Sequence, residues 1–571
     1  MNSFFVLILG ALVIAIGYAV YARRIDQDIV QPDPQKATPA KMYMDGVDFT
    51  PASRNVLFGY QFKSVAALAP LTGPIIAVQW GWLPALLWIL LGVFFIGWAQ
   101  DYGAMIMGVR REGDTMGALS YKLISPRARN ILMVFIYFYL LLIMGAFGNA
   151  VGKVLMTNPK VPFGMIALVL MGVLAGQMTY KWKQDIILTT VVTVVLTFVG
   201  IWISTLPFMS NIFSAIYGLP DSPTIFLGNT QAQVIGTLLM VIFCYLGAVL
   251  PIWSFAQPVN YVSFWIVTLG MVGGVIGLLI WRPGMGDFPV FTQFTAASGP
   301  LWPMLFVTIA CGAISGWHSL VSTSGTARQL EQETDALPVG GGAMFMEGAF
   351  AVIAFLTATV AFGGWQGYQD AGGPGAALAV FAGGLAKFLG RIGVPETFGT
   401  AYGSVFLTIM AITIMQLVVR FMRVAGAELV GDAVPAMKNV HVGSIVALLL
   451  TLLFVWVIPW LTIWGAFGGA NQLMAGLALL LITLWLMSEG RKHAWALYPA
   501  IFMIVTTIAA LLYLAYTNLV VKLPAAASVQ ASLASLLVGI ICLVLVIAAA
   551  FMIVDGWQAI QRAGKEEVAE A

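Results

Sequence analysis

Long runs of apolar residues, separated by short polar stretches, repeat along the whole chain of 571 residues. Most runs reach the length of about 20 residues that an α-helix needs to cross a bilayer, so they predict about fifteen membrane spans. The predicted spans are 3–21, 57–79, 84–108, 129–152, 162–181, 184–206, 231–252, 258–281, 301–321, 344–363, 401–423, 443–464, 469–488, 495–518 and 531–553. The shorter run 376–390 is rich in glycine and ends near Lys387 and Arg391, so we interpret it as re-entrant or interfacial.

Two of these spans are interrupted by residues that a plain membrane helix lacks. The first contains Ala69-Pro70-Leu71-Thr72-Gly73-Pro74, and the second contains Gly312-Ala313-Ile314-Ser315-Gly316-Trp317-His318-Ser319. Both prolines lack a backbone N–H and clash with the preceding helical turn. Secondary transporters use such broken helices as binding sites, at matching places in two structural repeats. We interpret the two stretches as such a pair.

The distribution of lysine and arginine predicts the topology. Basic residues follow the first, third, fifth, ninth, eleventh and thirteenth spans, which share one side if the N-terminus is outside and the C-terminus cytoplasmic. The two interrupted spans then run in opposite directions, as inverted repeats require. The predicted partition is a first helix and cytoplasmic loop (1–55), a five-helix repeat (56–206), an external loop with two inserted helices (207–300), a second repeat (301–490), and two C-terminal helices with a short tail (491–571).

Composition agrees with an all-α polytopic membrane protein, because 60% of the residues are hydrophobic and only 9% are charged. The net charge of +3 and the absence of a basic face argue against nucleic-acid binding. The three cysteines lie in apolar runs without metal-ligand spacing, which predicts buried apolar side chains and neither a metal nor a cofactor. Arg23 and Arg24 follow the first apolar run rather than precede it, which favours a retained helix over a cleaved signal peptide.

The first candidate site surrounds Gly73. Pro74 suits the first position of a new helical segment, whose free N–H groups and positive dipole end would bind a carboxylate. Unwound carbonyls such as that of Ala69 would hold a cation, although a simple proline kink would leave the same pattern. The predicted substrate-binding residues of this span are Ala69, Thr72, Gly73, Pro74 and Gln79. Lys63, earlier in the span, either extends to the inner surface or faces a polar cavity.

The second candidate site surrounds His318, the only histidine inside a predicted span. It would carry a proton or bind a substrate carboxylate, or else serve as a hydrogen-bonded structural histidine. The predicted substrate-binding residues here are Ser315, Gly316, Trp317 and His318, and the predicted coupling or gating residues are Asp101, Ser322, Thr323, Asn471 and Gln472. Each of these coupling residues has a structural alternative, a helix-end ion pair for Asp101 and interhelical hydrogen bonds for the others. No nucleophile–base arrangement appears, so the sequence does not predict an enzyme.

Several motifs resemble those of the carbon starvation protein A family of bacterial inner-membrane transporters. They are Phe58-Gly59 through Gly73-Pro74, Leu83-Pro84 through Gln100-Asp101, Cys311 through Gly316, Pro338-Val339-Gly340, Gly342-Ala343-Met344 to Met346-Glu347, and Phe467 through Leu473. The resemblance implies a LeuT-like fold and uptake of peptides, or of pyruvate with protons. The family usually has a His-His pair at Tyr60-Gln61 and often an Asp at Gln416. Because Tyr60 and Gln61 do not titrate near neutral pH, proton coupling would use His318 or Asp101.

We therefore expect a secondary active transporter, coupled to protons or sodium, that imports a carboxylate-bearing nutrient such as a peptide or pyruvate during carbon starvation. Its partners would be this small molecule and the lipid bilayer, and the sequence leaves both a monomer and a homodimer open. The alternative is a channel or a starvation-sensing membrane protein. A sensor would carry a sizeable cytoplasmic output domain, but the longest predicted cytoplasmic stretch is 22–55. A channel would show charge rings or a repeated filter, and the sequence shows neither.

Overall fold

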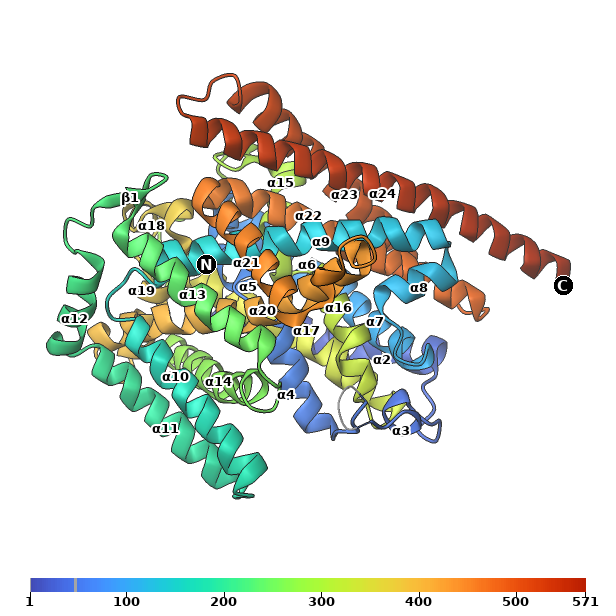
Figure 1. The fold of residues 1–571 in the computed structure, drawn as a ribbon, viewed down its shortest axis with the longest axis horizontal. Coiled ribbons are helices and arrows are strands. Elements are labelled where there is room, and N and C mark those ends of the chain that lie inside the picture. The colour runs from blue at the N-terminus through green and yellow to red at the C-terminus, as the bar shows by residue number, and fades with distance from the viewer. Residues whose placement is uncertain (1, 46–48, 571) are drawn as a thin grey trace.

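The structure is a computed structural model that describes residues 2–45 and 49–570, and these residues are nearly all helical. The helices before residue 220 are α1 (Ser3–Ile16), α2 (Arg23–Ile25), α3 (Pro39–Met42), α4 (Arg54–Val65), α5 (Ala69–Ala77), α6 (Trp82–Gly92), α7 (Trp98–Arg110), α8 (Met116–Leu123), α9 (Pro126–Ala150), α10 (Pro162–Gly176), α11 (Ile186–Ser204) and α12 (Pro207–Tyr217). Figure 1 shows the arrangement of the helices. Short π- and 3₁₀-helical turns extend several of them, and α1 continues in this way to Val30.

The remaining helices are α13 (Gln231–Val249), α14 (Ala256–Trp281), α15 (Leu301–Thr308), α16 (Gly316–Ser324), α17 (Gly342–Thr359), α18 (Trp365–Asp370), α19 (Ala377–Gly390), α20 (Glu396–Val430), α21 (Val440–Val457), α22 (Trp460–Ser488), α23 (Ala494–Tyr516) and α24 (Val529–Glu570). Two small antiparallel hairpins, β1–β2 (Thr224–Phe226 with Asn229–Thr230) and β3–β4 (Thr295–Ala296 with Gly299–Pro300), lie in connecting segments. Within the described residues, fourteen helices are long and apolar enough to cross a membrane.

The first interrupted span is broken, as predicted, but one turn earlier than expected. Helices α4 and α5 meet at a bend of 49°, and the extended backbone of Ala66 lies in the gap. The new segment begins at Ala69, with Pro70 in its first turn, where a missing N–H costs little. The prediction that Pro74 starts this segment is therefore wrong, since Pro74 lies inside α5, and Ala69 is the first helical residue rather than an unwound one.

The second interrupted span is also broken. Helix α15 is followed by the 3₁₀ turn η7 (Ala310–Gly312), and α16 begins only after the extended residue Ser315. Ala310 has a positive φ of 48°, a conformation that non-glycine residues rarely adopt. Because its two halves are short, this span is absent from the fourteen continuous helices, whereas α4 and α5 form a bent pair that would be a fifteenth span.

Helix α19 belongs to the stretch Gly373–Gly390, which is apolar enough to cross a membrane by composition alone. Glu333, before α17, pairs with Arg110 at the end of α7, while Glu428, near the end of α20, pairs with Arg129 at the start of α9. Helix α8, which joins α7 to α9, has 8 residues and is too short to cross, so both ion pairs lie on one side. Since α17 leaves this side and α20 returns to it, α19 begins and ends on the opposite side, the arrangement of a re-entrant or interfacial segment.

The contacts between helices repeat in the two halves of the chain. Helix α5 packs on α17, which follows the second broken span, and α16 packs on α7, which follows the first. Likewise α21 packs on α9 as α13 packs on α20, and α22 contacts α16 as α14 contacts α4. Inverted repeats produce such exchanged contacts, and the described residues form an all-α, polytopic fold, as predicted. We propose that α10 and α11 are the inserted pair and that the first repeat ends with α14, in place of the predicted boundary at 206.

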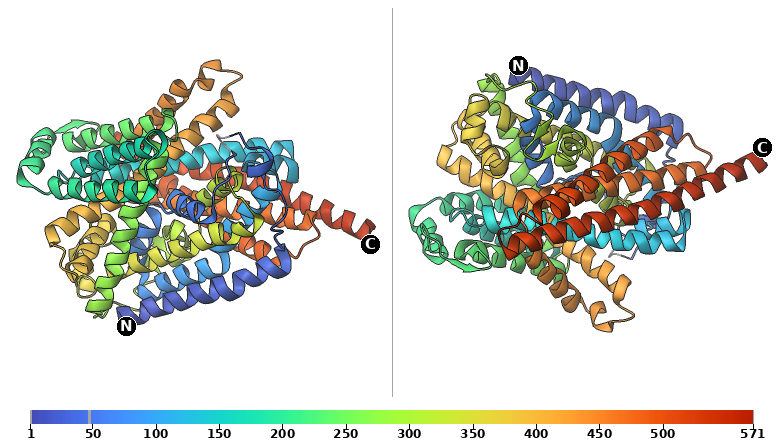
Figure 2. Two further views of the ribbon diagram at one scale, coloured as in Figure 1. Left: turned by 90° about the horizontal axis from the view of Figure 1, so that it is seen from below. Right: turned by 90° about the horizontal axis from the view of Figure 1, so that it is seen from above.

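Peripheral helices surround this centre. Figure 2 shows α1 running along one side of the body, and α23 and α24 along another. Asn2 bonds to the carbonyl of Arg282 at the end of α14, whereas Ile29 accepts a hydrogen bond from Arg491, beside Arg110 and its partner Glu489. Helix α1 and its extension therefore span the full thickness between the two faces. Only 22% of their most apolar stretch of 18 residues is buried by the rest of the protein. The rest of its surface is available to lipid.

Candidate functional site

The two broken spans touch where they are broken. Gly73 of α5 lies directly against Ile309, so a β-carbon at this position would be 2.5 Å from the Ile309 carbonyl oxygen. On the other half of each span, the Trp317 indole donates a 2.7 Å hydrogen bond to the carbonyl of Ser64, beside the first break. The predicted meeting of two antiparallel broken helices in the interior is thus confirmed by direct contacts on both sides of the breaks.

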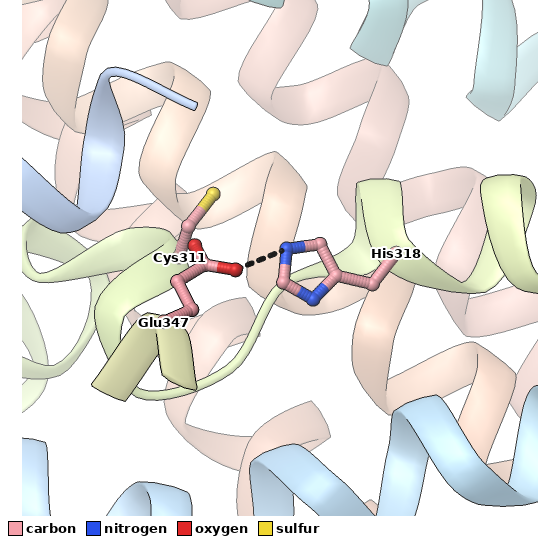
Figure 3. Close-up of side chains that lie close together, drawn as sticks. All are labelled: Cys311, His318 and Glu347. Carbon is pink, nitrogen blue, oxygen red and sulfur yellow. Dashed lines mark ion pairs between the residues drawn. The ribbon is translucent and has the colours of Figure 1, made fainter. Parts of the chain in front are cut away.

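A histidine between two carboxylates lies beside these breaks. His318 Nδ1 of α16 is 2.8 Å from Asp101 Oδ2 of α7, and its Nε2 is 3.2 Å from Glu347 Oε2 of α17. Figure 3 shows the Glu347 carboxylate facing one edge of the imidazole. All three side chains have 0% exposure. The structure therefore joins two predicted residues, His318 and Asp101, to a third that was not among the predicted site residues.

The geometry suits a protonated imidazole. A carboxylate at each ring nitrogen is an acceptor, and only the imidazolium has an N–H at both positions. Nδ1 makes a hydrogen bond to Asp101, but the contact of Nε2 with Glu347 is an ion pair without hydrogen-bond geometry. Both Glu347 oxygens consequently lack a hydrogen-bond partner although they are fully buried. A buried carboxylate without donors is costly as an anion, which makes Glu347 the group in this cluster with most to gain from a proton.

Cys311 adds a thiol to the same place. The ligand atoms of Cys311, His318 and Glu347 all lie within 4.8 Å of one another, close enough for the three to surround a soft divalent cation (Figure 3). The thiol instead donates to Ser315 Oγ at 3.1 Å and contacts the Asn471 amide. An imidazolium held by two carboxylates has no lone pair left for a metal. A metal ion would therefore need His318 in its neutral form, so metal binding and the two ion pairs exclude each other at this site.

Asn471 and Gln472 of α22 hold the second break in place. The Asn471 Oδ1 accepts hydrogen bonds from the Trp317 backbone N–H at 3.3 Å, from Ser315 Oγ, and from the Tyr139 hydroxyl at 2.6 Å. It thereby caps the first turn of α16, whose N–H groups would otherwise lack partners. Gln472 Nε2 donates to the Ala310 carbonyl in η7. These bonds show what the two amides hold, while a coupling role for them stays a prediction.

The predicted residues of the first span lie on both sides of the contact with Ile309. Thr72 Oγ1 donates back to the Leu68 carbonyl in the break, and Gly73 provides the crossing point. Gln79 lies at the far end, where its amide exchanges hydrogen bonds with Ser298 in the loop before α15. The structure therefore places Gly73 at the crossing and Ala69, Thr72 and Pro74 in the same helix α5, whereas Gln79 lies apart, after the end of that helix.

Helix α16 presents its predicted residues in different directions. Gly316 fits against the Asn471 backbone, since a β-carbon there would be 2.3 Å from its carbonyl oxygen. Ser322 accepts a 2.9 Å hydrogen bond from the Gln61 amide of α4, which joins α4 of the first span to α16 of the second. Thr323 Oγ1 bonds to the Ser319 carbonyl within its own helix. Ser322 thus belongs to a contact between the broken spans, whereas Thr323 does not.

Sequence reasoning missed Glu347 and Lys63 as members of the site. Glu347 lies one turn inside α17, where a helix-end position was expected, and the signal was its place in an otherwise apolar run. Lys63 does not reach the inner surface, because its residue is only 2% exposed and its ammonium donates to Thr413 Oγ1 of α20 at 2.7 Å. The alternative of a polar interior therefore holds for Lys63.

The cluster is closed off from solvent in this structure. On the side of Arg110, a cavity of about 290 Å³ opens between α8, α9, α16 and α20. Its lining includes Leu320 and Ser324 of α16 and Arg420 and Phe421 of α20. The Phe421 ring packs edge-on against Trp317, one turn before Leu320, and Trp317 is 2% exposed. Phe421 thus lines the cavity and also packs on Trp317, while none of the three ion-pair residues lines the cavity.

Comparisons with known proteins identify relatives over most of the chain. The family model described as "Carbon starvation protein CstA" matches residues 2–367 and 366–510. The peptide transporter CstA of Escherichia coli (strain K12) is 27% identical over 591 residues, which cover 89% of this chain and 80% of that protein. The pyruvate/proton symporter BtsT of the same organism is 29% identical over 365 residues, which cover 63% of this chain and 49% of that protein.

Solved structures were compared as well. The crystal structure of MhsT in complex with L-phenylalanine aligns over 89% of this chain and 99% of that one, with 13% sequence identity and a TM-score of 0.46. A structure of a manganese transporter of Eremococcus coleocola aligns over 90% of this chain, with 12% identity and a TM-score of 0.42.

Proposed function

Because the chain belongs to the carbon starvation protein CstA family, we propose that it is a secondary active transporter that imports a small carboxylate-bearing nutrient. Peptides and pyruvate are the candidate substrates, since the relatives are named as a peptide transporter and a pyruvate/proton symporter. The protein is a multi-pass membrane protein, and we place it in the bacterial inner membrane with its N-terminus outside and its C-terminus in the cytoplasm. The family name connects this import to carbon starvation.

One observation carries this proposal. Two antiparallel broken helices meet inside an apolar body, and a cluster of ionisable side chains without access to solvent lies beside the breaks. Charged side chains at membrane depth are expensive and mark substrate or ion pathways. A site enclosed on both sides suits alternating access, in which it opens to one side at a time.

We infer that protons rather than sodium ions drive the transport. A sodium site needs several oxygen ligands with little competing positive charge, whereas both buried carboxylates of the cluster already face His318. A histidine between two acids can instead gain or lose a proton without moving a metal ion through the site. The substrate would bind between the two breaks, near Ser64, Ala69 and Trp317.

Uptake by purified protein in proteoliposomes tests the proposal. Labelled pyruvate and labelled trialanine are offered under an inward proton gradient, an inward sodium gradient, or neither, with protein-free liposomes as the control. We expect concentrative uptake of at least one substrate under the proton gradient alone. Uptake that needs sodium would refute proton coupling. Flux that never exceeds equilibrium under either gradient would refute a secondary active transporter and favour a channel.

A further inference from the structure

Lys63 is a buried amino group with a single hydrogen-bond partner. It lies in the last turn of α4, directly before the first break, and its ammonium makes one hydrogen bond, to the neutral Thr413 hydroxyl. Among the residues that the structure describes, no carboxylate forms a salt bridge with Lys63. Glu347 is the carboxylate whose charge acts on Lys63 from a distance. An ammonium has three donors, and burial is costly unless they are used. Within the described residues, two of the three Lys63 donors therefore lack an acceptor, which an anionic ligand would supply.

The other positive ends near the breaks are already occupied or weakened. The N-terminal turn of α16 is capped by Asn471. The N-terminal turn of α5 contains Pro70, which offers no N–H, and the N–H groups of Leu71 and Thr72 both bond to Leu68. The imidazole of His318 is held by two carboxylates. Of these groups, the Lys63 ammonium is thus the best placed to take a carboxylate.

The charges of the cluster balance before the substrate arrives. If both carboxylates are ionised and both His318 and Lys63 are protonated, Asp101 and Glu347 contribute −1 each and His318 and Lys63 contribute +1 each, so the sum is zero. A bound monocarboxylate changes the sum to −1 in a buried site. One proton on a carboxylate of the cluster returns it to zero, and a low dielectric makes this compensation strongly favourable.

We propose that Lys63 binds the carboxylate of the substrate and that Glu347 takes up the co-transported proton in the same binding step. This inference rests on the proposed function. On the outer side, the substrate carboxylate pairs with Lys63, and one proton from the water forms an O–H bond with Glu347. On the inner side, that O–H bond breaks, the proton passes to the cytoplasm, and the substrate leaves. One proton and one carboxylate cross together, so a monocarboxylate moves without net charge.

In this proposal, Glu347 rather than Asp101 is the acid that changes its protonation state. Glu347 is faced by Lys63 from α4, Asp101 from α7, Cys311 from η7 and His318 from α16. Asp101 keeps a 2.8 Å hydrogen bond to His318, and these two form a neutral pair. Glu347 has no hydrogen bond in the described structure, and its charge interacts with Lys63 only at a distance. When the substrate takes Lys63, Glu347 loses part of its stabilisation, while Asp101 loses none.

Comparison of an acid with its amide tests the role of Lys63. The substrate concentration that gives half-maximal uptake is measured in proteoliposomes for pyruvate and pyruvamide. If the wild type transports only peptides, trialanine and its C-terminal amide are used instead. Wild type should prefer the acid at least about tenfold, the effect of one charge-assisted contact. Lys63→Met should remove this preference, and Lys63→Arg should keep most of it. Lys153→Met, a half-buried membrane lysine that bonds to the Val455 carbonyl, is the matched control and should keep it fully.

The coupling step is tested by exchange and by membrane potential. Glu347→Gln should still exchange labelled for unlabelled substrate across the membrane, but it should no longer accumulate substrate under a proton gradient. Wild-type uptake of pyruvate should respond to the pH gradient and be insensitive to an imposed potential. If Lys63→Met proves unfolded, the same acid–amide comparison is made by thermal shift on wild type and Lys63→Arg.

The outcomes separate this inference from the function on which it rests. Wild-type protein that transports none of these compounds would overturn the proposed function. Normal wild-type transport with an unchanged acid preference in Lys63→Met, or proton-driven accumulation by Glu347→Gln, would overturn the inference alone. In the thermal-shift version, equal stabilisation of wild type by acid and amide would overturn it.

Discussion

Adding one methyl group at Gly73 should test the crossing of the two broken spans directly. In Gly73→Ala the new β-carbon would lie 2.5 Å from the Ile309 carbonyl oxygen and 2.8 Å from its carbonyl carbon and α-carbon. All three are backbone atoms, so no side chain can rotate away. The segments must separate by about 0.5 Å or more to reach an allowed contact, and both are packed on every side.

The size of the effect follows from the cost of overpacking. Extra methyl groups in a tightly packed interior cost about 1–3 kcal/mol, and that range corresponds to about 5- to 150-fold in an equilibrium. The penalty falls on the state in which the breaks are in contact. If transport passes through this closed state, we expect the uptake rate of Gly73→Ala to fall within that range, and that of Gly73→Leu to be abolished.

Gly59 supplies a matched control on the same broken span. A β-carbon at Gly59 would meet no atom within 4 Å, and Gly59 lies inside the regular helix α4. Alanine in a helix is favoured over glycine by up to about 1 kcal/mol. Gly59→Ala should therefore insert and transport like wild type, or be slightly more stable.

The assay is initial-rate uptake in proteoliposomes containing equal amounts of monodisperse wild type, Gly73→Ala and Gly59→Ala. Folding is followed by thermal unfolding in detergent. If Gly73→Ala folds normally and takes up substrate at the wild-type rate, the two segments do not approach each other during transport as they do in this structure. Equal losses in both variants would show that the effect of an added methyl group is not specific to the crossing.

Further predictions address other contacts of the site. Trp317→Phe removes the hydrogen bond to Ser64, so we expect a loss of about 1 kcal/mol in a thermal unfolding assay; an unchanged melting curve would show that the contact is unimportant. His318→Ala leaves Asp101 and Glu347 without their cation, so the pH profile of uptake should change, and an identical profile would remove His318 from coupling. Chelation with EDTA should leave uptake unchanged, whereas a loss that zinc restores would identify a metal centre. A tag at the N-terminus should be reached from outside the cell, and a C-terminal tag only after permeabilisation; equal access would contradict an odd number of crossings.

Much of the fold could be predicted because the membrane restricts the alternatives. Apolar runs of fixed length identify the spans, and the lysine and arginine residues in the loops between them predict the direction in which each span crosses. The breaks could be located to within a turn, since prolines and small residues interrupt the runs. The exact start of α5 could not, because Pro70 and Pro74 both suit a first turn. Tertiary packing against Ile309 favours the helix that starts at Ala69.

The composition of the site was harder to predict, because it depends on contacts between distant elements. His318 was identified by its rarity inside a span, but its partners lie 217 residues earlier in the chain, at Asp101, and on the following helix, at Glu347. Lys63 had two alternatives that sequence alone could not separate, since a lysine one turn from a helix end can extend to water or turn inward. Only its position beside Thr413 on α20 distinguishes them.

The two contacts between the broken spans differ in kind, which affects how the site opens. Helix α5 meets the end of α15 through backbone packing at Gly73, whereas α4 meets α16 through Gln61, which donates to Ser322 and accepts from Thr326 at 2.5 Å. Side-chain hydrogen bonds can be exchanged for water at a net cost of about 1 kcal/mol each, but close-packed backbones cannot separate so easily.

Opening toward the cavity beside Leu320 should therefore be the easier movement from this closed structure. Gln61 stands where family members usually have a histidine, and an amide does not respond to pH. The contact between α4 and α16 at Gln61 is consequently neutral, and under the proposed coupling the protonation step occurs instead at the ion pair of His318 and Glu347. Under that proposal, the substrate charge rather than the pH at Gln61 decides when Glu347 is protonated.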